Sequence, residues 1–185
     1  MDDMKIKPTL YHSSSNRNLK IIEPRANSYR DKDEGLVVFA SDDKSYVSCF
    51  LVRTNDSWAQ ISKYRITNQP TIYVHCISDE KRFRELDKGG AIYTLPNETF
   101  YLDQSKGDTE WASKVSVKPI KKEIYESGLD AMIEHGVLVY FCDEEKLKKY
   151  KEVASESSKA FELLKSMESE NEKRGLKNPI HEYNY

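Results

Sequence analysis

The sequence predicts an α+β fold with mixed or antiparallel β-sheets split around a cleft, a few short helices and a long charged C-terminal helix. Two observations predict it. The segments rich in β-branched and aromatic residues do not alternate regularly with helical segments, which excludes a repeated strand–helix–strand architecture. After residue 142 the chain becomes dense in Glu, Lys, Ser and Ala and contains neither Pro nor Gly before Gly175.

The expected strands share apolar, β-branched and aromatic residues bounded by turn residues. They are expected at residues 9–12, 36–40, 70–77, 91–95, 99–102, 115–120 and 137–141. The 115–120 segment alternates in a period of two, and Pro119 places it at a sheet edge or near its own end. Residues 55–69 are assigned to no particular element, although Trp58, Ile61, Tyr64 and Ile66 need to be buried.

Short helices are expected at 43–52, where Ser41-Asp42-Asp43 offers an N-cap, for one turn after residue 78, and at 128–135. One continuous helix is expected from 143 to about 174, packing over its first half and entering solvent over its second. We therefore expect an α+β domain over 1–142, a C-terminal helix over 143–175 and a disordered tail over 176–185.

Net charge, cysteine spacing and the length of apolar runs indicate which kinds of partner and which cellular compartment to expect. The 185 residues include 29 basic and 31 acidic ones, a net charge of −2, so no basic excess favours nucleic acid as a partner. Three widely spaced cysteines argue against a disulfide framework and predict buried thiols in a reducing compartment. No apolar run approaches the ~20 residues that span a bilayer, and no signal segment is evident, so a cytoplasmic protein is expected.

Several familiar catalytic and binding motifs are missing from the sequence. There is no GxxxxGK[ST] phosphate loop and no GxGxxG dinucleotide fingerprint. There is also no HExxH or CxxC pattern, and no metal site is predicted. Function therefore has to be sought in a looser arrangement of residues.

Three segments supply such an arrangement. Tyr11-His12-Ser13-Ser14 ends the first expected strand, and a histidine followed by a hydroxyl can hold a planar polar ligand. The segment from Gly35 to Ser41 precedes a helix that carries Ser45 and Tyr46. Glu110-Trp111-Ala112-Ser113 follows a turn late in the chain. The long irregular stretch over residues 16–33 is typical of a functional cover.

Together these segments, over about residues 9–120, resemble the ADP-ribosyltransferase superfamily, in particular its poly-ADP-ribose-polymerase and diphtheria-toxin-like branch. In that branch a His-Gly-Ser/Thr triplet closes the first strand. A Gly-x-Tyr-Phe-Ala/Ser segment and the helix after it form the nicotinamide pocket, and a glutamate opens a late strand. The resemblance implies that NAD, or a related nucleotide, is bound as a substrate and that ADP-ribose is transferred to an acceptor.

The resemblance also implies roles for individual residues. His12 would bind the ribose beside the nicotinamide, and Glu110 would stabilise the positive charge that develops on that ribose. Both would line one cleft. Arg25 would pair with the pyrophosphate, for which a guanidinium is suited. The remaining residues implied in the NAD site are Tyr11, Ser14, Phe39, Ser41, Ser45 and Tyr46.

Three alternatives stay open. Ser13 stands where the family has glycine, which suggests a non-catalytic binding module of the same fold, with a protein partner bound through the C-terminal helix. An RNA-end-processing relative would need a basic groove, for which lysines near 114–122 are available. Glu98 competes with Glu110 for the role of the carboxylate.

Overall fold

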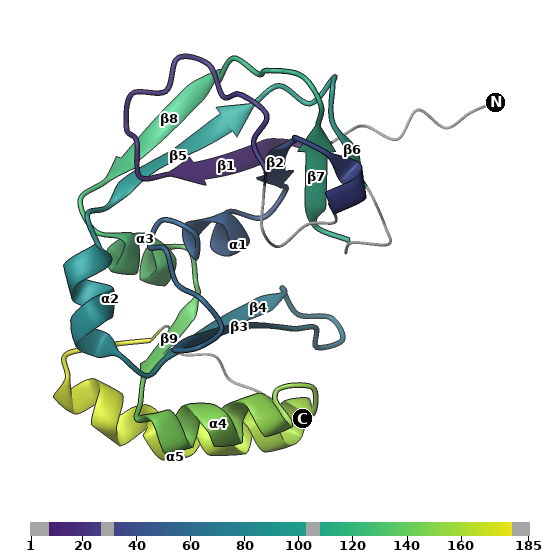
Figure 1. The fold of residues 1–185 in the computed structure, drawn as a ribbon. Helices are drawn as coiled ribbons and strands as arrows, with labels where there is room; N and C mark the ends of the chain where they lie inside the picture. The colour runs from purple at the N-terminus through teal and green to yellow at the C-terminus, as the bar shows by residue number, and fades with distance from the viewer. Residues whose placement is uncertain (1–7, 27–31, 103–107, 179–185) are drawn as a thin grey trace.

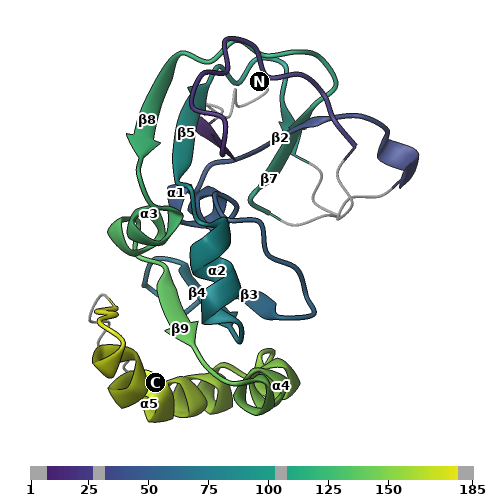
Figure 2. The ribbon, with the colours of Figure 1, turned by 60° about the vertical axis from the view of Figure 1, so that its left-hand side comes forward.

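The computed structural model describes residues 8–26, 32–102 and 108–178, and it confirms the predicted α+β class. Its elements lie in layers (Figures 1 and 2). A six-stranded sheet lies above helices α1 (Lys44–Ser48) and α3 (Gly128–Glu134), and a three-stranded sheet lies below them. Helices α4 (Glu144–Val153) and α5 (Ser157–Lys173) form the bottom layer.

The six-stranded sheet is antiparallel throughout and has the strand order β6-β7-β2-β1-β5-β8. Its strands are β1 (Leu10–Ser14), β2 (Val38–Ser41), β5 (Gly90–Leu95), β6 (Tyr101–Leu102), β7 (Glu110–Ser113) and β8 (Lys121–Tyr125). A single 3₁₀ turn, η1 (Lys32–Glu34), precedes β2.

The three-stranded sheet has the order β3-β4-β9, with β3 (Ala59–Tyr64) antiparallel and β9 (Leu138–Phe141) parallel to β4 (Ile72–Ile77). Strand β3 was not predicted. Its sequence, Ala-Gln-Ile-Ser-Lys-Tyr, alternates between apolar and polar residues only as far as Ser62, because Lys63 takes a position on the face that Ala59 and Ile61 share. The alternation is therefore short.

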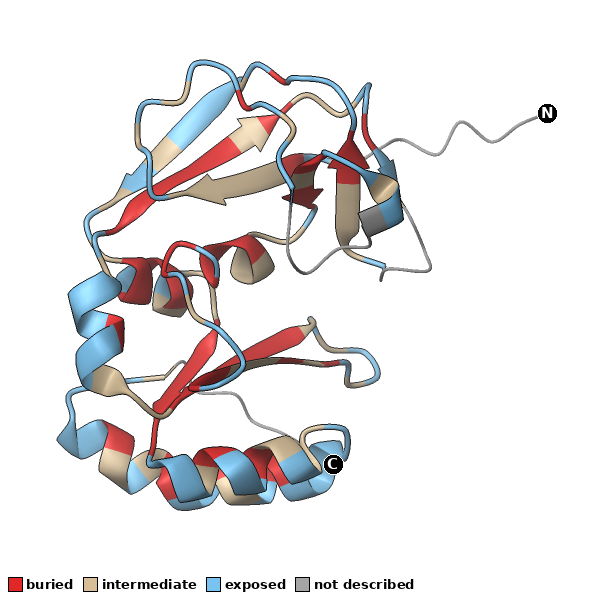
Figure 3. Cartoon of the chain, viewed as in Figure 1, coloured by how far each residue is buried: buried red, intermediate tan, exposed pale blue. Residues whose placement is uncertain are grey.

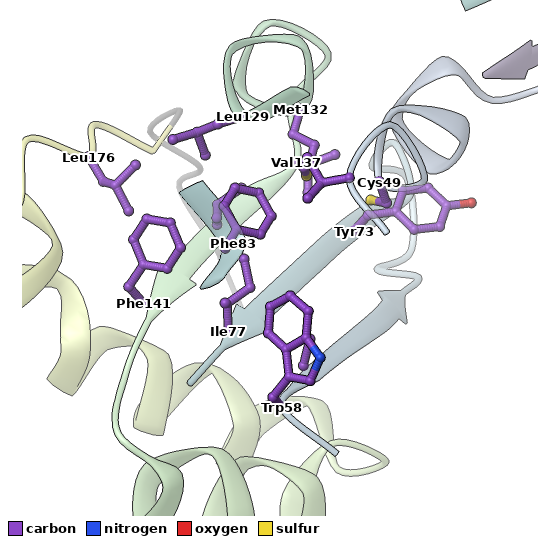
Figure 4. Close-up of a cluster of buried hydrophobic side chains, with 13 residues drawn as sticks. Cys49, Trp58, Tyr73, Ile77, Phe83, Leu129, Met132, Val137, Phe141 and Leu176 are labelled. Atoms are coloured by element: carbon purple, nitrogen blue, oxygen red, sulfur yellow. The ribbon is translucent and has the colours of Figure 1, made fainter. Parts of the chain in front are cut away.

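Apolar side chains cover both faces of the three-stranded sheet. All six residues of β4 are buried (Figure 3). One face packs on α3 and on α2 (Glu80–Leu86), and Phe83 of α2 lies against Phe141 of β9 with ring centroids 5.5 Å apart (Figure 4). The opposite face packs on Leu147, Tyr150 and the buried side of α5. This sheet is therefore the most enclosed part of the fold.

The two faces of the six-stranded sheet are covered by different segments. Tyr11 and Ile92 pack on Val47 of α1 and Ala131 of α3. On the opposite face, Leu10, Val38 and Tyr93 pack with Ile22 and Val117, which come from the long loops after β1 and β7. The predicted cover over residues 16–33 thus contributes core residues where it is described.

The predicted strand over residues 115–120 is wrong. Val117 forms only an isolated bridge to Ile22, and the edge strand β8 begins after Pro119 and Ile120. Val115 and Ile120 are 51% and 70% exposed, so the alternating apolar residues do not form a buried face. Pro119 lacks the backbone N–H that would continue a ladder.

The predicted single C-terminal helix is divided in two by a break between Val153 and Ser157. At this break the chain reverses direction and α5 runs back along α4. Lys146 of α4 therefore pairs with Glu170 of α5 at 2.7 Å. Both halves of α5 are packed, because Phe161 and Met167 are each buried against the three-stranded sheet. The long C-terminal helix itself is confirmed as α5.

The first residues of the predicted disordered tail are also packed. Leu176 is buried beside Phe141, and the Asn178 side chain accepts from Val139 N at 2.9 Å and donates to Val139 O at 3.0 Å. Asn171 Oδ1 accepts from Phe141 N at 3.0 Å. These amides satisfy the outer edge of β9, where an unpaired ladder would otherwise be exposed. Residues 179–185 lie outside the described part.

All three cysteines are free and buried, as predicted. Among the described residues, no helix is both long enough and apolar enough to cross a membrane.

Candidate functional site

The pairing of strands places three of the predicted site residues in one row. Tyr11 of β1 lies opposite Ser41 of β2, and Ser41 lies opposite Glu110 of β7. Residues directly opposite in neighbouring strands project to the same face of a sheet. Phe39, two positions before Ser41, shares that face, which is the one packed on α1.

Helix α1 brings Tyr46 onto this row. Its N-cap Asp43 accepts from Ser45 N at 2.9 Å, which fixes where the helix starts. The Tyr46 hydroxyl then donates to Glu110 Oε1 at 2.8 Å. Burial, together with the charge of Glu110, raises the pKa of Tyr46 well above its usual value. Tyr46 therefore stays protonated and holds the Glu110 carboxylate as a hydrogen-bond donor.

Aromatic rings fix the Tyr46 side chain. Phe39 and Phe50 contact its ring edge-on, with centroids 6.1 Å and 5.0 Å away. Tyr73 of β4 stacks on it at 5.3 Å with an interplanar angle of 26°. Through this stacking, the row of residues on the six-stranded sheet contacts the three-stranded sheet near the start of β4.

An ion pair crosses between the sheets at the same place. Lys63 of β3, directly opposite Tyr73, donates to Asp108 Oδ1 at 2.5 Å and to Thr109 Oγ1 at 3.3 Å. Arg65 also pairs with Asp108. Burial and the neighbouring Arg65 lower the pKa of Lys63. We call Tyr46, Lys63, Tyr73, Asp108 and Glu110 the inter-sheet cluster.

His12 does not join this cluster. It lies opposite Tyr93 of β5, and the alternation along β1 assigns its side chain to the face opposite Tyr11 and Glu110. Its Nδ1–H donates to Phe39 O at 2.7 Å. Burial lowers the pKa of His12, with a smaller contribution from the charge of Arg25. The structure thus places His12 and Glu110 on opposite faces, whereas the resemblance implied one shared cleft.

The predicted hydroxyls are used by the fold itself. Ser14 Oγ accepts from Asn16 N at 3.1 Å, and Ser41 Oγ accepts from Asp43 N at 3.2 Å. Ser45 Oγ donates to His135 O at 2.6 Å, which ties α1 to the end of α3. Of these three, only Ser41 belongs to the Glu110 row.

Arg25 and Tyr11 have different surroundings. Arg25 is exposed, and its backbone pairs with Val37, the residue before β2. Its charge contributes to the lowered pKa of His12. The Tyr11 ring packs under α1, with Lys44 Nζ 5.0 Å from its centroid.

The two candidate carboxylates also differ. Glu98 lies in the exposed turn before β6, whereas Glu110 is half-buried and is held by Tyr46. The geometry therefore favours Glu110. Sequence reasoning missed Lys63 and Tyr73, although Tyr73 was placed in a strand. The mismatch between a lysine and the apolar residues along β3 was the only signal at Lys63.

An open groove of about 670 Å³ lies away from the inter-sheet cluster, between α1, β8 and α3. Tyr125 and His135 meet in it, with the hydroxyl and Nε2 2.8 Å apart, and Lys44 pairs there with Glu123 at 2.8 Å. Of the residues predicted for the NAD site, none lines it. In the described ranges no three His, Cys, Asp or Glu residues are grouped so as to hold a metal ion.

Comparison of the chain with models of protein families, with curated proteins and with solved structures found no match.

Proposed function

We propose that this protein binds NAD or a related nucleotide at the inter-sheet cluster and transfers its ADP-ribosyl group, with Glu110 as the catalytic carboxylate. The observation that supports this best is the 2.8 Å hydrogen bond from Tyr46 to Glu110. It holds a half-buried carboxylate in one orientation, at the point where the two sheets meet.

A carboxylate beside the ribose accelerates cleavage of the bond between ribose and nicotinamide. When the bond between ribose and nicotinamide breaks, positive charge develops on the sugar. A negative charge that is already in place stabilises this transition state more than the ground state. With water as the acceptor, the carbon–nitrogen bond breaks, a carbon–oxygen bond forms, and the proton from water passes to solvent.

The surroundings of Glu110 fit a planar ring. Phe39, Tyr46 and Phe50 form an aromatic group beside the carboxylate, and Phe50 is 39% exposed. Aromatic faces and edges of this kind bind flat heterocycles such as nicotinamide. Under this proposal His12 supports the sheet through its bond to Phe39 O rather than binding the ribose.

Replacing Glu110 with Gln tests the proposal, because Gln keeps the size of the side chain and an oxygen for Tyr46 but removes the charge. Nicotinamide release from NAD should fall by about a hundredfold or more, the usual cost of losing one such electrostatic group. Binding of NAD, measured by calorimetry, should change little. The matched variant Glu98→Gln should release nicotinamide at the wild-type rate. Equal rates for the wild type and Glu110→Gln would contradict the proposal.

One observation favours a second function, a binding module without chemistry. The histidine that the resemblance assigns to the ribose lies on the other face, and the Ser41 and Ser45 hydroxyls already have partners in the fold. In that case the wild-type protein binds NAD or ADP-ribose without releasing nicotinamide. The same assay therefore separates the two functions.

A further inference from the structure

The Tyr73 hydroxyl is buried and has no hydrogen-bond partner. The residue is 1% exposed, and its oxygen has almost no contact with solvent. Thr109 lies near enough to affect the pKa of Tyr73, but it does not meet the geometry of a hydrogen bond to it. A buried, unpaired hydroxyl destabilises a fold, so its presence needs an explanation.

The position of this hydroxyl separates it from the other unpaired buried groups in the described ranges. Figure 4 shows that it points out of the apolar cluster that holds the Tyr73 ring. The Asp42 and Asp43 charges at the start of α1 act on it. The other unpaired atoms belong to residues outside the inter-sheet cluster, and Trp111 takes a strand position on the face opposite to Glu110; they are Trp58 Nε1, Ser62 Oγ, Trp111 Nε1 and Asn171 Nδ2.

A partly exposed ion pair lies next to Tyr73. Lys63 lies directly opposite Tyr73, and its long side chain is 28% exposed and paired with Asp108. An ion pair between partly exposed groups contributes little to stability, so displacing the Lys63 amine is inexpensive. Beside the hydroxyl, Tyr46 stacks on the Tyr73 ring and bonds Glu110.

We propose that Tyr73 is a ligand-binding residue, whose hydroxyl pairs with a ribose hydroxyl of the nucleotide bound beside Glu110 when Lys63 swings aside. A ribose hydroxyl can both donate and accept, so it suits the phenol in either direction. This inference rests on the proposed function, because it concerns the same site. In the free protein the Tyr73 hydroxyl has no hydrogen-bond partner, and the bound nucleotide supplies one.

Replacing Tyr73 with Phe gives two readouts of opposite sign. Removing an unpaired buried hydroxyl should raise the melting temperature of the free protein by about 2–4 °C. The same change should weaken binding of NAD, measured by calorimetry, by about three- to tenfold, because one hydrogen bond to the ligand is lost. A purely structural tyrosine would not move these two quantities in opposite directions.

Tyr64→Phe is the matched control on the neighbouring strand. The Tyr64 hydroxyl lies 2.9 Å from the Tyr150 hydroxyl, so its removal should lower the melting temperature and leave NAD binding unchanged. If Tyr73→Phe binds NAD as tightly as the wild type, or melts at a lower temperature, the inference is overturned while the proposed function stands. If the wild type does not bind NAD, both are overturned.

Discussion

The three-stranded sheet is buried on both faces, whereas the six-stranded sheet is only partly covered. Every residue of β4 and β9 is buried, but in β1 only Leu10 is, and β8 is half-buried or exposed along its whole length. In the candidate site, Glu110 stands on the partly covered sheet and Tyr46 on α1 below it. The enclosed sheet contributes Lys63 and Tyr73, both from its end.

We infer from this difference that the residues that stabilise the fold and the residues of the candidate site lie largely in different parts of the molecule. Closely packed apolar side chains cover both faces of the three-stranded sheet and contribute strongly to stability. The six-stranded sheet keeps half-buried positions, where a side chain such as Glu110 is held in place by a hydrogen bond. Changes in the apolar layers of the three-stranded sheet should therefore affect stability, and changes in the inter-sheet cluster should affect ligand binding.

The largest effect is expected for Phe83→Ala in the layer over the three-stranded sheet. Phe83 is fully buried and contacts the His75 and Phe141 rings edge-on. Truncating it leaves a cavity and should lower the free energy of unfolding by about 3–5 kcal/mol, measured by urea denaturation. Leu86→Ala on the same helix, where the side chain is 43% exposed, is the control and should cost well under half as much. Similar losses of unfolding free energy for both variants would contradict the expected difference between buried and exposed positions.

A smaller effect is expected from pH. His75 is fully buried in β4, contacts Met132 Sδ and Thr54 Oγ1, and burial lowers its pKa to about 4. Because the unfolded state binds the proton more readily, stability should be complete above about pH 6.5 and fall as pH drops toward 4. The loss should total about 3 kcal/mol from this group.

Urea denaturation of the wild type and of His75→Gln across that pH range checks this expectation. The variant will have lower stability at pH 7, but its stability should decline less steeply below pH 6.5. Half-buried His12 and His135, whose pKa values burial also lowers, account for a remaining slope. An identical decline in both proteins would show that His75 is not the group responsible.

The sequence predicted the fold class and most strands because long apolar runs such as residues 70–77 belong to buried sheets. It missed β3 because Lys63 points toward the cluster while its neighbours on the same face are apolar. It joined α4 and α5 because the residues between them are good helix formers, and only tertiary packing, seen in the Lys146–Glu170 pair, shows the reversal.

The candidate site was predicted in part for a similar reason. Short motifs predicted Tyr11, Phe39, Ser41, Tyr46 and Glu110 as site residues, and the structure places four of them on one face of the sheet with Tyr46 of α1 against that face. Alternation along β1 puts His12 and Tyr11 on opposite faces, but only the pairing of the strands shows that Tyr11, and not His12, shares a face with Glu110. No sequence motif distinguishes Tyr73, and only the unpaired hydroxyl in the structure indicates a role for it.

A crystal structure of the protein with NAD would show which face of the six-stranded sheet holds the nucleotide. We expect the ribose attached to nicotinamide to lie against Glu110 and Tyr46, on the face that packs on α1. Density for the ribose on the His12 face, or in the groove between α1, β8 and α3, would contradict it.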